Sequence, residues 1–381
     1  MSIEGEIVVR LAPAAGRVAR VSIRSTRPLA GARVVVGRGV AEAAALLPRL
    51  YSVCANAQGA ASACALEAAA GRAPAPAVLD ARAFAVALEN LQEDLRRLLV
   101  DVPAVLGQAP RVQPVAELRR AFAPLLHGGS AIAAGGATHA SRRAAIDLAA
   151  DVVEGHVLGE PLAAFARRTD ADALEAWARA TPTAPAEALG AVLDRAPGLG
   201  ASDVETLPPM CRARVEAMLA ALLADPAYAM RPRVEGEARE TGALARMAGH
   251  PAVAAFVRRH GRGVASRLAA RVADVARTTQ ALADGAPPAC VDAWSTPSGM
   301  GAARVETARG MLLHCAEVRD GLVAAYGIVA PTEWNFQPGG PLERSLAGLD
   351  AGDADALAQD ARLVVQSLDP CVACGIEVGD A

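Results

Sequence analysis

The first forty residues carry short runs that are rich in β-branched side chains. Glu6–Leu11 and Arg17–Arg24 are two such runs, and a Pro-Ala-Ala-Gly turn separates them. Because β-branched residues fit the pleated surface of a sheet, these runs predict two strands. The shorter run Val34–Val36 predicts a third strand.

From about residue 40 onward the apolar residues recur every three or four positions, which predicts amphipathic helices. Gly and Pro residues interrupt this pattern and mark the places where one helix ends and the next begins. The predicted helices are Ala41–Leu47, Ala57–Ala70, Asp80–Val100, Pro114–Leu126, Ser141–Val153, Ala171–Ala180, Pro185–Asp194, Arg212–Leu223 and Gly261–Ala283.

After residue 299 the period changes again. Strands are predicted at Val305–Glu306, Met311–Arg319 and Leu322–Ala330, and Asp320–Gly321 is typical of a hairpin turn. Two further helices are predicted near Leu342–Leu349 and Ala354–Val365.

These elements predict an α+β fold that is predominantly helical, a helical bundle with small β elements near the N- and C-terminal regions. We expect the two ends of the chain to meet on one flank. We interpret residues 1–381 as a single domain, with an N-terminal β region over 1–39, a helical body over 40–285 and a C-terminal β/α region over 299–381.

Composition and charge exclude several classes of protein. Hydrophobic residues make up 53% of the chain and charged residues 21%, so the chain can bury a sizeable core. The net charge of −3 argues against a nucleic-acid partner, which requires a basic face. All 38 basic residues are Arg, which excludes Schiff-base lysines and the P-loop lysine.

The chain is expected to be cytoplasmic. No apolar run approaches the roughly 18–20 residues that a membrane span needs, and we expect no membrane insertion. The start, MSIEGEIVV, is acidic and lacks the features of a signal peptide. Seven cysteines in such a chain are more typical of buried residues or metal ligands than of disulfides.

Cys371 and Cys374 form the motif C-x-x-C, whose two thiolates can converge on one metal or oxidise to a disulfide. A pair of small buried residues is the alternative. A closed zinc site would need two further ligands from scattered positions. Cys54 has no partner nearby in the sequence. We interpret the remaining cysteines as packing residues, namely Cys64, Cys211, Cys290 and Cys315.

Several segments, in order along the whole chain, resemble motifs of the large subunit of nickel–iron hydrogenases. The resemblance is closer still to accessory proteins of the HupK/HoxV type, which are similar to degenerate large subunits. The matching segments are Ile3–Glu6, Arg49–Cys54 followed by Gln58, Thr241–Arg246, Glu306–His314, Ala330–Asn335, and Asp369–Cys374 followed by Glu377. The last three are the specific ones.

The resemblance implies an incomplete metal site. Cys54 and Cys374 match the cysteines that bridge nickel and iron in the family, and Cys371 matches one terminal nickel ligand. Tyr51 stands at the position of the other, and a phenol is a poor substitute for a thiolate on nickel. The iron ligands are therefore retained and the four-thiolate nickel site is not. Two ligands of the family's structural magnesium are replaced as well, by Arg10 and Glu377.

The family's iron carries two cyanides and one carbon monoxide. Arg309 and Thr332 match the positions that donate hydrogen bonds to the cyanides, and such donors suit anionic ligands in a dry pocket. The alternatives are a surface salt bridge for Arg309 and a turn hydroxyl for Thr332. Glu4 matches the family's proton-relay carboxylate, but a solvated carboxylate is an equally good interpretation.

The resemblance implies a protein that is not an enzyme. We expect a scaffold in hydrogenase maturation that holds the iron–dicyanide–carbonyl unit transiently, without nickel, and passes it to the hydrogenase large subunit. The implied partners are that subunit, a HypC-type chaperone and a HypD-type iron scaffold. The alternatives are a structural or electron-transfer paralogue of the hydrogenase and complex I type without bound metal, and a thiol or zinc protein that uses Cys371 and Cys374.

Overall fold

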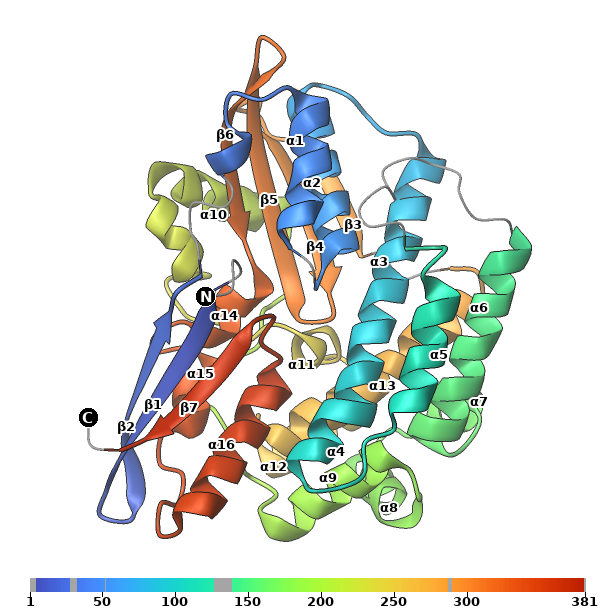
Figure 1. Ribbon diagram of the computed structural model, residues 1–381, viewed down its shortest axis with the longest axis vertical. Coiled ribbons are helices and arrows are strands. Elements are labelled where there is room, and N and C mark those ends of the chain that lie inside the picture. Colours follow the sequence, from blue (N-terminus) through green and yellow to red (C-terminus); the bar gives the residue numbers. More distant parts are fainter. Residues whose placement is uncertain (1–4, 28–32, 52, 127–138, 287–289, 380–381) are drawn as a thin grey trace.

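The computed structural model describes residues 5–27, 33–51, 53–126, 139–286 and 290–379. A body of helices fills one side of the molecule and two small sheets lie on the other (Figure 1). The helices are α1 (Val40–Leu46), α2 (Ala55–Ala69), α3 (Pro76–Arg96), α4 (Val102–Val105), α5 (Val112–Phe122), α6 (His139–Val152), α7 (Leu162–Phe165), α8 (Ala171–Ala180), α9 (Ala184–Arg195), α10 (Arg212–Ala224), α11 (Ala243–Arg246), α12 (Pro251–His260), α13 (Val264–Ala283), α14 (Pro331–Phe336), α15 (Pro341–Leu346) and α16 (Ala354–Leu368).

The first sheet joins the two ends of the chain. Its strands are β1 (Glu6–Ala14), β2 (Arg17–Ser25) and β7 (Ala373–Val378), in the order β2-β1-β7. β1 runs antiparallel to β2 and parallel to β7 (Figure 1). The expectation that the two ends meet on one flank is therefore confirmed.

The second sheet is an antiparallel meander. Its strands β3 (Val291–Ser295), β4 (Gly301–Thr307), β5 (Gly310–Arg319) and β6 (Leu322–Val329) lie in sequence order. The predicted hairpin turn is confirmed, and both of its residues, Asp320 and Gly321, have positive φ as the tight turn requires.

The second sheet is covered by α2, a helix built almost entirely of small residues (Figure 1). Gly301 shows how closely the two approach, because a Cβ atom at this position would lie 2.0 Å from the carbonyl oxygen of Ala65. This contact seats the C-terminal half of α2 on the sheet, and Cys54 is the residue that precedes the opposite end of the helix.

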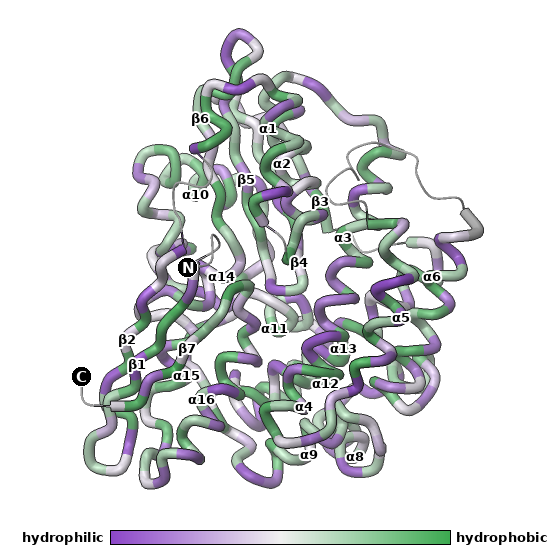
Figure 2. The backbone as a smooth tube through the Cα atoms, in the orientation of Figure 1, coloured by the Kyte–Doolittle hydropathy of each residue, from purple (hydrophilic) through white to green (hydrophobic). Residues whose placement is uncertain are grey.

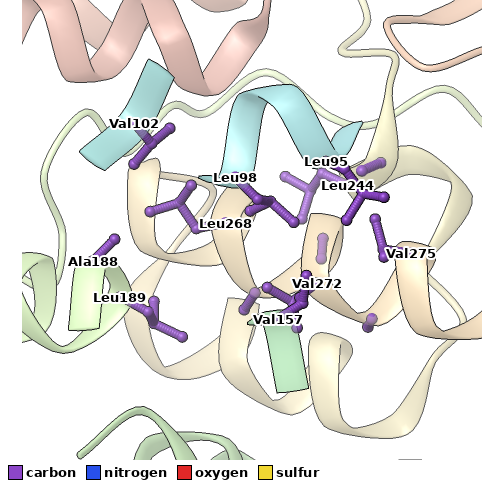
Figure 3. Packing of buried hydrophobic residues seen from close by; sticks show 14 of the residues in the cluster. Leu95, Leu98, Val102, Val157, Ala188, Leu189, Leu244, Leu268, Val272 and Val275 are labelled. Carbon is purple, nitrogen blue, oxygen red and sulfur yellow. The ribbon is translucent and has the colours of Figure 1, made fainter. Parts of the chain in front are cut away.

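The main core lies between α3 and α13. Figure 3 shows Leu95 of α3 and Leu98 of the π-helical turn after it, packed near Leu268 and Val272 of α13. Figure 2 shows that both helices also contain hydrophilic stretches. Many of these polar side chains are buried, including Arg82, Asp94, Arg267, Arg271 and Asp274. Buried charges need partners, and they find them around the candidate site.

The predominantly helical α+β fold predicted from the sequence is observed, and most predicted helices lie within a few residues of observed ones. The prediction of a third N-terminal strand is wrong, because Val34–Val36 lies in a short 3-10 segment and the turn that follows it. β3, α12, α14 and β7 had no counterpart in the predictions. Within the described ranges, no helix combines the length and apolar character that crossing a bilayer requires.

Candidate functional site

The candidate site lies where three distant segments meet: the residues before α2, the start of α14 and the loop after α16. Cys54 is the N-cap residue of α2, and Thr332 is in the first turn of α14. The Thr332 hydroxyl donates to Cys371 Sγ over 3.1 Å. Cys371 lies close enough to Cys54 for its charge to raise the pKa of the Cys54 thiol. The structure therefore places an N-terminal thiol and a C-terminal thiol at the same site.

Side chains of α3 and α2 surround Cys54 and its backbone. The Glu89 carboxylate of α3 accepts hydrogen bonds from the backbone N–H groups of Asn56 and Ala57 at 2.8 and 2.9 Å, and so caps α2. The Gln58 amide lies 3.8 Å from Cys54 Sγ. Burial, helped by the charges of Glu89 and Cys371, raises the pKa of Cys54 to about 12 although the charge of Arg309 opposes this. The thiol is therefore protonated in the free protein near pH 7, and it would have to lose this proton to act as a metal ligand.

Cys374 is set apart from this pair. It lies in β7 opposite Ile7 of β1, and its half-buried side chain packs against the main core. Burial alone raises its pKa to about 12. In the described part of the chain, no three His, Cys, Asp or Glu side chains converge as a metal site would require. Of the three predicted thiol ligands, two lie at the same site, and the metal-binding role of all three stays a prediction.

Arg309 lies in the loop between β4 and β5 and is only 4% exposed. Its guanidinium donates to the Glu93 carboxylate over 2.8 Å and lies 3.3 Å from Asp369. Its charge also acts on Cys54 and Cys371. The surface salt bridge that was the alternative for Arg309 is wrong, because the ion pair is buried beside the thiols.

Asp369 anchors the loop that carries the C-x-x-C motif. Its carboxylate pairs with Arg97, with Arg271 over 2.9 Å and with Arg309. Burial would raise the pKa of Asp369, but the three guanidinium charges outweigh it and lower that pKa. Its backbone is in the left-handed region with φ of 57°, just before Pro370. The three guanidinium groups thus hold the chain in a turn that directs Cys371 toward Thr332.

Three residues on the other side of Cys371 complete the site. Arg27, which follows β2, forms an ion pair with Glu333 of α14. Tyr51 lies beside them, and burial raises its pKa to about 12 although Arg27 opposes this. The sequence reasoning gave no role to Arg27, Glu333 or Glu89. The only available signals were Glu333, where the family has Thr, and Glu89, a carboxylate inside an apolar stretch.

Other residues named in the sequence analysis lie near the site or in the first sheet. His314 is fully buried and lies 3.0 Å from Gln58 Oε1 and 2.6 Å from the Tyr326 hydroxyl, while Cys315 faces another core. Arg10 and Glu377 are register partners in β1 and β7 and pair over 2.6 Å, so the residues at the two former magnesium positions neutralise each other.

The four cysteines interpreted as packing residues divide into two groups. Cys64, Cys290 and Cys315 are buried, which confirms the interpretation, but Cys211 is exposed, so it was wrong for that residue. Glu4 lies outside the described residues.

Comparison with known proteins supports the resemblance along the whole chain. The family model for nickel-dependent hydrogenase matches residues 234–377. The hydrogenase expression/formation protein HupK of Azotobacter vinelandii is 33% identical, and the match covers 95% of each chain. The hydrogenase expression/formation protein HoxV of Cupriavidus necator is 28% identical over 94% of this chain and 93% of that protein.

Solved structures show the same fold. The Ni-Fe-Se hydrogenase from D. vulgaris Hildenborough superposes with a TM-score of 0.62 at 17% identity, and the match covers 94% of each chain. The hydrogenase large-subunit-like fold expected from the sequence is thereby confirmed. Because the similarity to HupK spans nearly the full length of both proteins, the chain belongs to the HupK/HoxV family of hydrogenase expression/formation proteins.

Proposed function

We propose that this protein is a non-catalytic scaffold in the maturation of nickel–iron hydrogenase. Its cargo is the iron that carries two cyanides and one carbon monoxide. Cys54 and the thiols of the C-x-x-C motif hold this unit transiently, and the protein then passes it to the hydrogenase large subunit. The names of the full-length relatives, hydrogenase expression/formation proteins, support a role in maturation.

The observation that carries the proposal is the meeting of Cys54 and Cys371 beside Arg309 and Thr332. Thiolates are the ligands that a soft iron centre prefers. A buried guanidinium and a hydroxyl are suitable donors for the anionic cyanides. In the free protein the Thr332 hydroxyl donates a hydrogen bond to Cys371 Sγ. When the iron unit binds, this hydroxyl would donate to a cyanide instead.

A carrier must release its cargo, and the donor set favours release. Tyr51 stands where a complete site has a fourth thiolate; a phenol is neutral near pH 7, and burial, which raises the pKa of Tyr51 to about 12, disfavours the phenolate further. Nickel, which this family's enzymes hold with four thiolates, does not fit such a set. We therefore expect neither stoichiometric nickel nor hydrogenase activity, and we expect the protein to work in the cytoplasm.

The test is an infrared spectrum with metal analysis on protein purified without oxygen from cells that express the maturation machinery. We expect cyanide and carbonyl stretches, iron and no nickel in the wild type, and loss of the stretches in Cys54→Ser. Cys211→Ser is the matched control, because that thiol is exposed. Stoichiometric nickel, or iron that survives in Cys54→Ser, would contradict the proposal.

Two further variants identify the second thiol ligand. If Cys374→Ser loses the iron unit and Cys371→Ser keeps it, the ligand is the one implied by the family resemblance, and binding must draw Cys374 away from the main core. The reverse result would identify Cys371, which already lies close enough to Cys54 in the free protein to raise its pKa.

The proposed partners are the hydrogenase large subunit, a HypC-type chaperone and a HypD-type iron scaffold. Mixing the loaded protein with apo large subunit should move the infrared bands to the large subunit, which size-exclusion chromatography separates from the scaffold. A metal-free protein with a blank spectrum that forms a stable complex with an iron–sulfur subunit would instead support the structural or electron-transfer paralogue. Zinc bound through Cys371 and Cys374 would support the thiol or zinc protein.

A further inference from the structure

A buried positive charge lies among the ligands of the candidate site. The side chain of Arg27 is 12% exposed and forms an ion pair with Glu333, which is 16% exposed. Glu333 directly follows Thr332, whose hydroxyl lies 3.1 Å from Cys371 Sγ. Cys371, Glu333, Tyr51 and Cys54 all lie close enough to Arg27 for their charges to raise its pKa against the effect of burial. The guanidinium therefore lies on the same side of the site as Cys371 and Tyr51.

The backbone places Arg27 firmly. Gly5 has φ of 76°, and a Cβ atom at this position would lie 2.7 Å from both Cα and N of Arg27. Thr26 and Glu6 exchange hydrogen bonds, with the Thr26 N–H donating to the Glu6 carbonyl over 2.9 Å and the Glu6 N–H to Thr26 Oγ1 over 3.0 Å. The start of β1 and the end of β2 are thus locked together, and Arg27 leaves this junction toward α14.

A guanidinium in this place has a direct consequence for metal binding. Arg is always protonated, so its charge cannot be relieved by loss of a proton. A divalent ion bound by Cys371 would share a water-poor site with that charge, and like charges repel strongly there. Tyr51 offers a neutral phenol in place of an anionic ligand. The position beside Cys371 therefore has one thiol, one phenol and one fixed cation.

We propose that Arg27 determines the metal selectivity of this site: its guanidinium, held by Glu333, occupies the place of a second divalent metal beside Cys371 and Tyr51. The site then accepts one metal-bearing unit and excludes nickel and similar ions next to it. This inference rests on the proposed function, because it assumes that Cys54 and Cys371 are metal-binding thiols.

The test titrates the purified, oxygen-free protein with Co(II) chloride and records the absorption of thiolate-to-cobalt charge transfer. Co(II) is the probe because it prefers ligands similar to those of nickel and reports thiolate ligation directly. We expect little charge-transfer absorption in the wild type. Arg27→Met should bind Co(II) at least about tenfold more tightly, because the repelling charge is gone. Arg27→Lys, which keeps the charge, should behave like the wild type.

Two controls separate charge exclusion from other effects. Arg27→Met leaves Glu333 without its partner, and that carboxylate could itself bind Co(II). The double variant Arg27→Met, Glu333→Thr removes both charges and should still gain Co(II) binding with charge-transfer absorption. Arg10→Met also breaks an Arg–Glu pair, but an exposed one in the same sheet, and should show no gain. Circular dichroism and the Tm report whether each variant is folded.

The outcomes distinguish this inference from the proposed function. A folded double variant that binds Co(II) no better than the wild type would overturn the inference, as would strong thiolate–Co(II) binding by the wild type. The infrared test of iron loading is made on wild-type protein alone. Iron loading can therefore succeed even if Arg27 does not determine metal selectivity. Conversely, tighter Co(II) binding by Arg27→Met together with a blank infrared spectrum of the wild type would contradict the proposed iron cargo, but not the exclusion of a divalent metal by Arg27.

Discussion

The two sheets of this protein contribute to the candidate site in different ways. The meander β3–β6 is formed by consecutive strands, and the first seven residues of β5 are all buried. The sheet β2-β1-β7 pairs β1 with residues 367 positions away in β7. In β1 only alternate residues are fully buried, namely Ile7, Val9 and Leu11. β2 and β7 are largely exposed.

This difference in burial and in sequence separation divides the candidate site into two halves, one with Cys54 and one with the C-x-x-C motif. Local contacts form at low entropic cost, whereas pairing the two ends of a chain must overcome the entropy of closing a long loop. The strands of the meander pair locally, and α2, although more than 200 residues away in the sequence, packs closely on the buried sheet that they form. The C-x-x-C motif lies at the start of the exposed strand β7, and the charges around Asp369 hold it there. We expect the half of the site with Cys371 and Cys374 to be the half that moves when cargo is loaded or released.

The largest expected effect comes from Asp369→Ala, which removes the anchor of the C-x-x-C loop. It leaves Arg97, Arg271 and Arg309 buried with one carboxylate fewer. Breaking a buried ion pair on one side costs about 3–5 kcal/mol of unfolding free energy. Urea denaturation measures this loss of unfolding free energy. Asp203→Ala, which removes an exposed carboxylate, should change stability by less than about 0.5 kcal/mol. Equal effects of the two substitutions would contradict the anchoring role.

The next effect compares the two sheets directly. Gly301→Ala places a Cβ atom 2.0 Å from the Ala65 carbonyl oxygen and 2.3 Å from the Ala69 nitrogen, where only backbone could yield. Overpacking of this kind should cost about 3 kcal/mol. Gly375→Ala in β7 meets nothing within 4 Å and should be nearly neutral. If thermal unfolding shows similar losses for both, the tight seating of α2 on the meander is not what stabilises this half.

A smaller effect depends on pH. Burial lowers the pKa of His314 to about 3, whereas an unfolded His titrates near 6.5. Between these pH values the unfolded state binds a proton that the folded state does not. The free energy of unfolding therefore falls as the pH decreases from about 6.5 toward 3. The loss should reach about 2 kcal/mol at pH 5. Urea denaturation at several pH values should show a shallower decline in His314→Gln and an unchanged one in His156→Gln, an exposed control.

The smallest effect is expected on the exposed sheet. Arg10→Ala removes the ion pair with Glu377 across β1 and β7, whose side chains are 63% and 56% exposed. Solvent screens such a pair, so the change should stay below about 1 kcal/mol. The measurement is the unfolding free energy at low and high salt, where the wild-type advantage should vanish at high salt. A loss that persists at high salt would mean that this pair is a structural element of the sheet closure.

The sequence by itself determined most of the helices and strands, because amphipathic periodicity and turn residues act over a few positions. It also identified Cys54, Cys371, Arg309 and Thr332 as candidate residues, because they lie in short motifs whose order along the chain resembles a known family. Val34–Val36 shows the limit of local reasoning, since an apolar run can serve a turn as well as a strand.

Only the tertiary structure decided which of these residues meet. It brought Cys54 to Cys371 and left Cys374 in β7, and it added Glu89, Asp369 and Arg27 to the site. The physical reason is that a buried charge is tolerated only with a partner, and here the partners come from segments far apart in the chain. The periodicity of apolar residues indicates which face of a helix or strand is buried. It does not indicate which charged residue from a distant segment lies against that face.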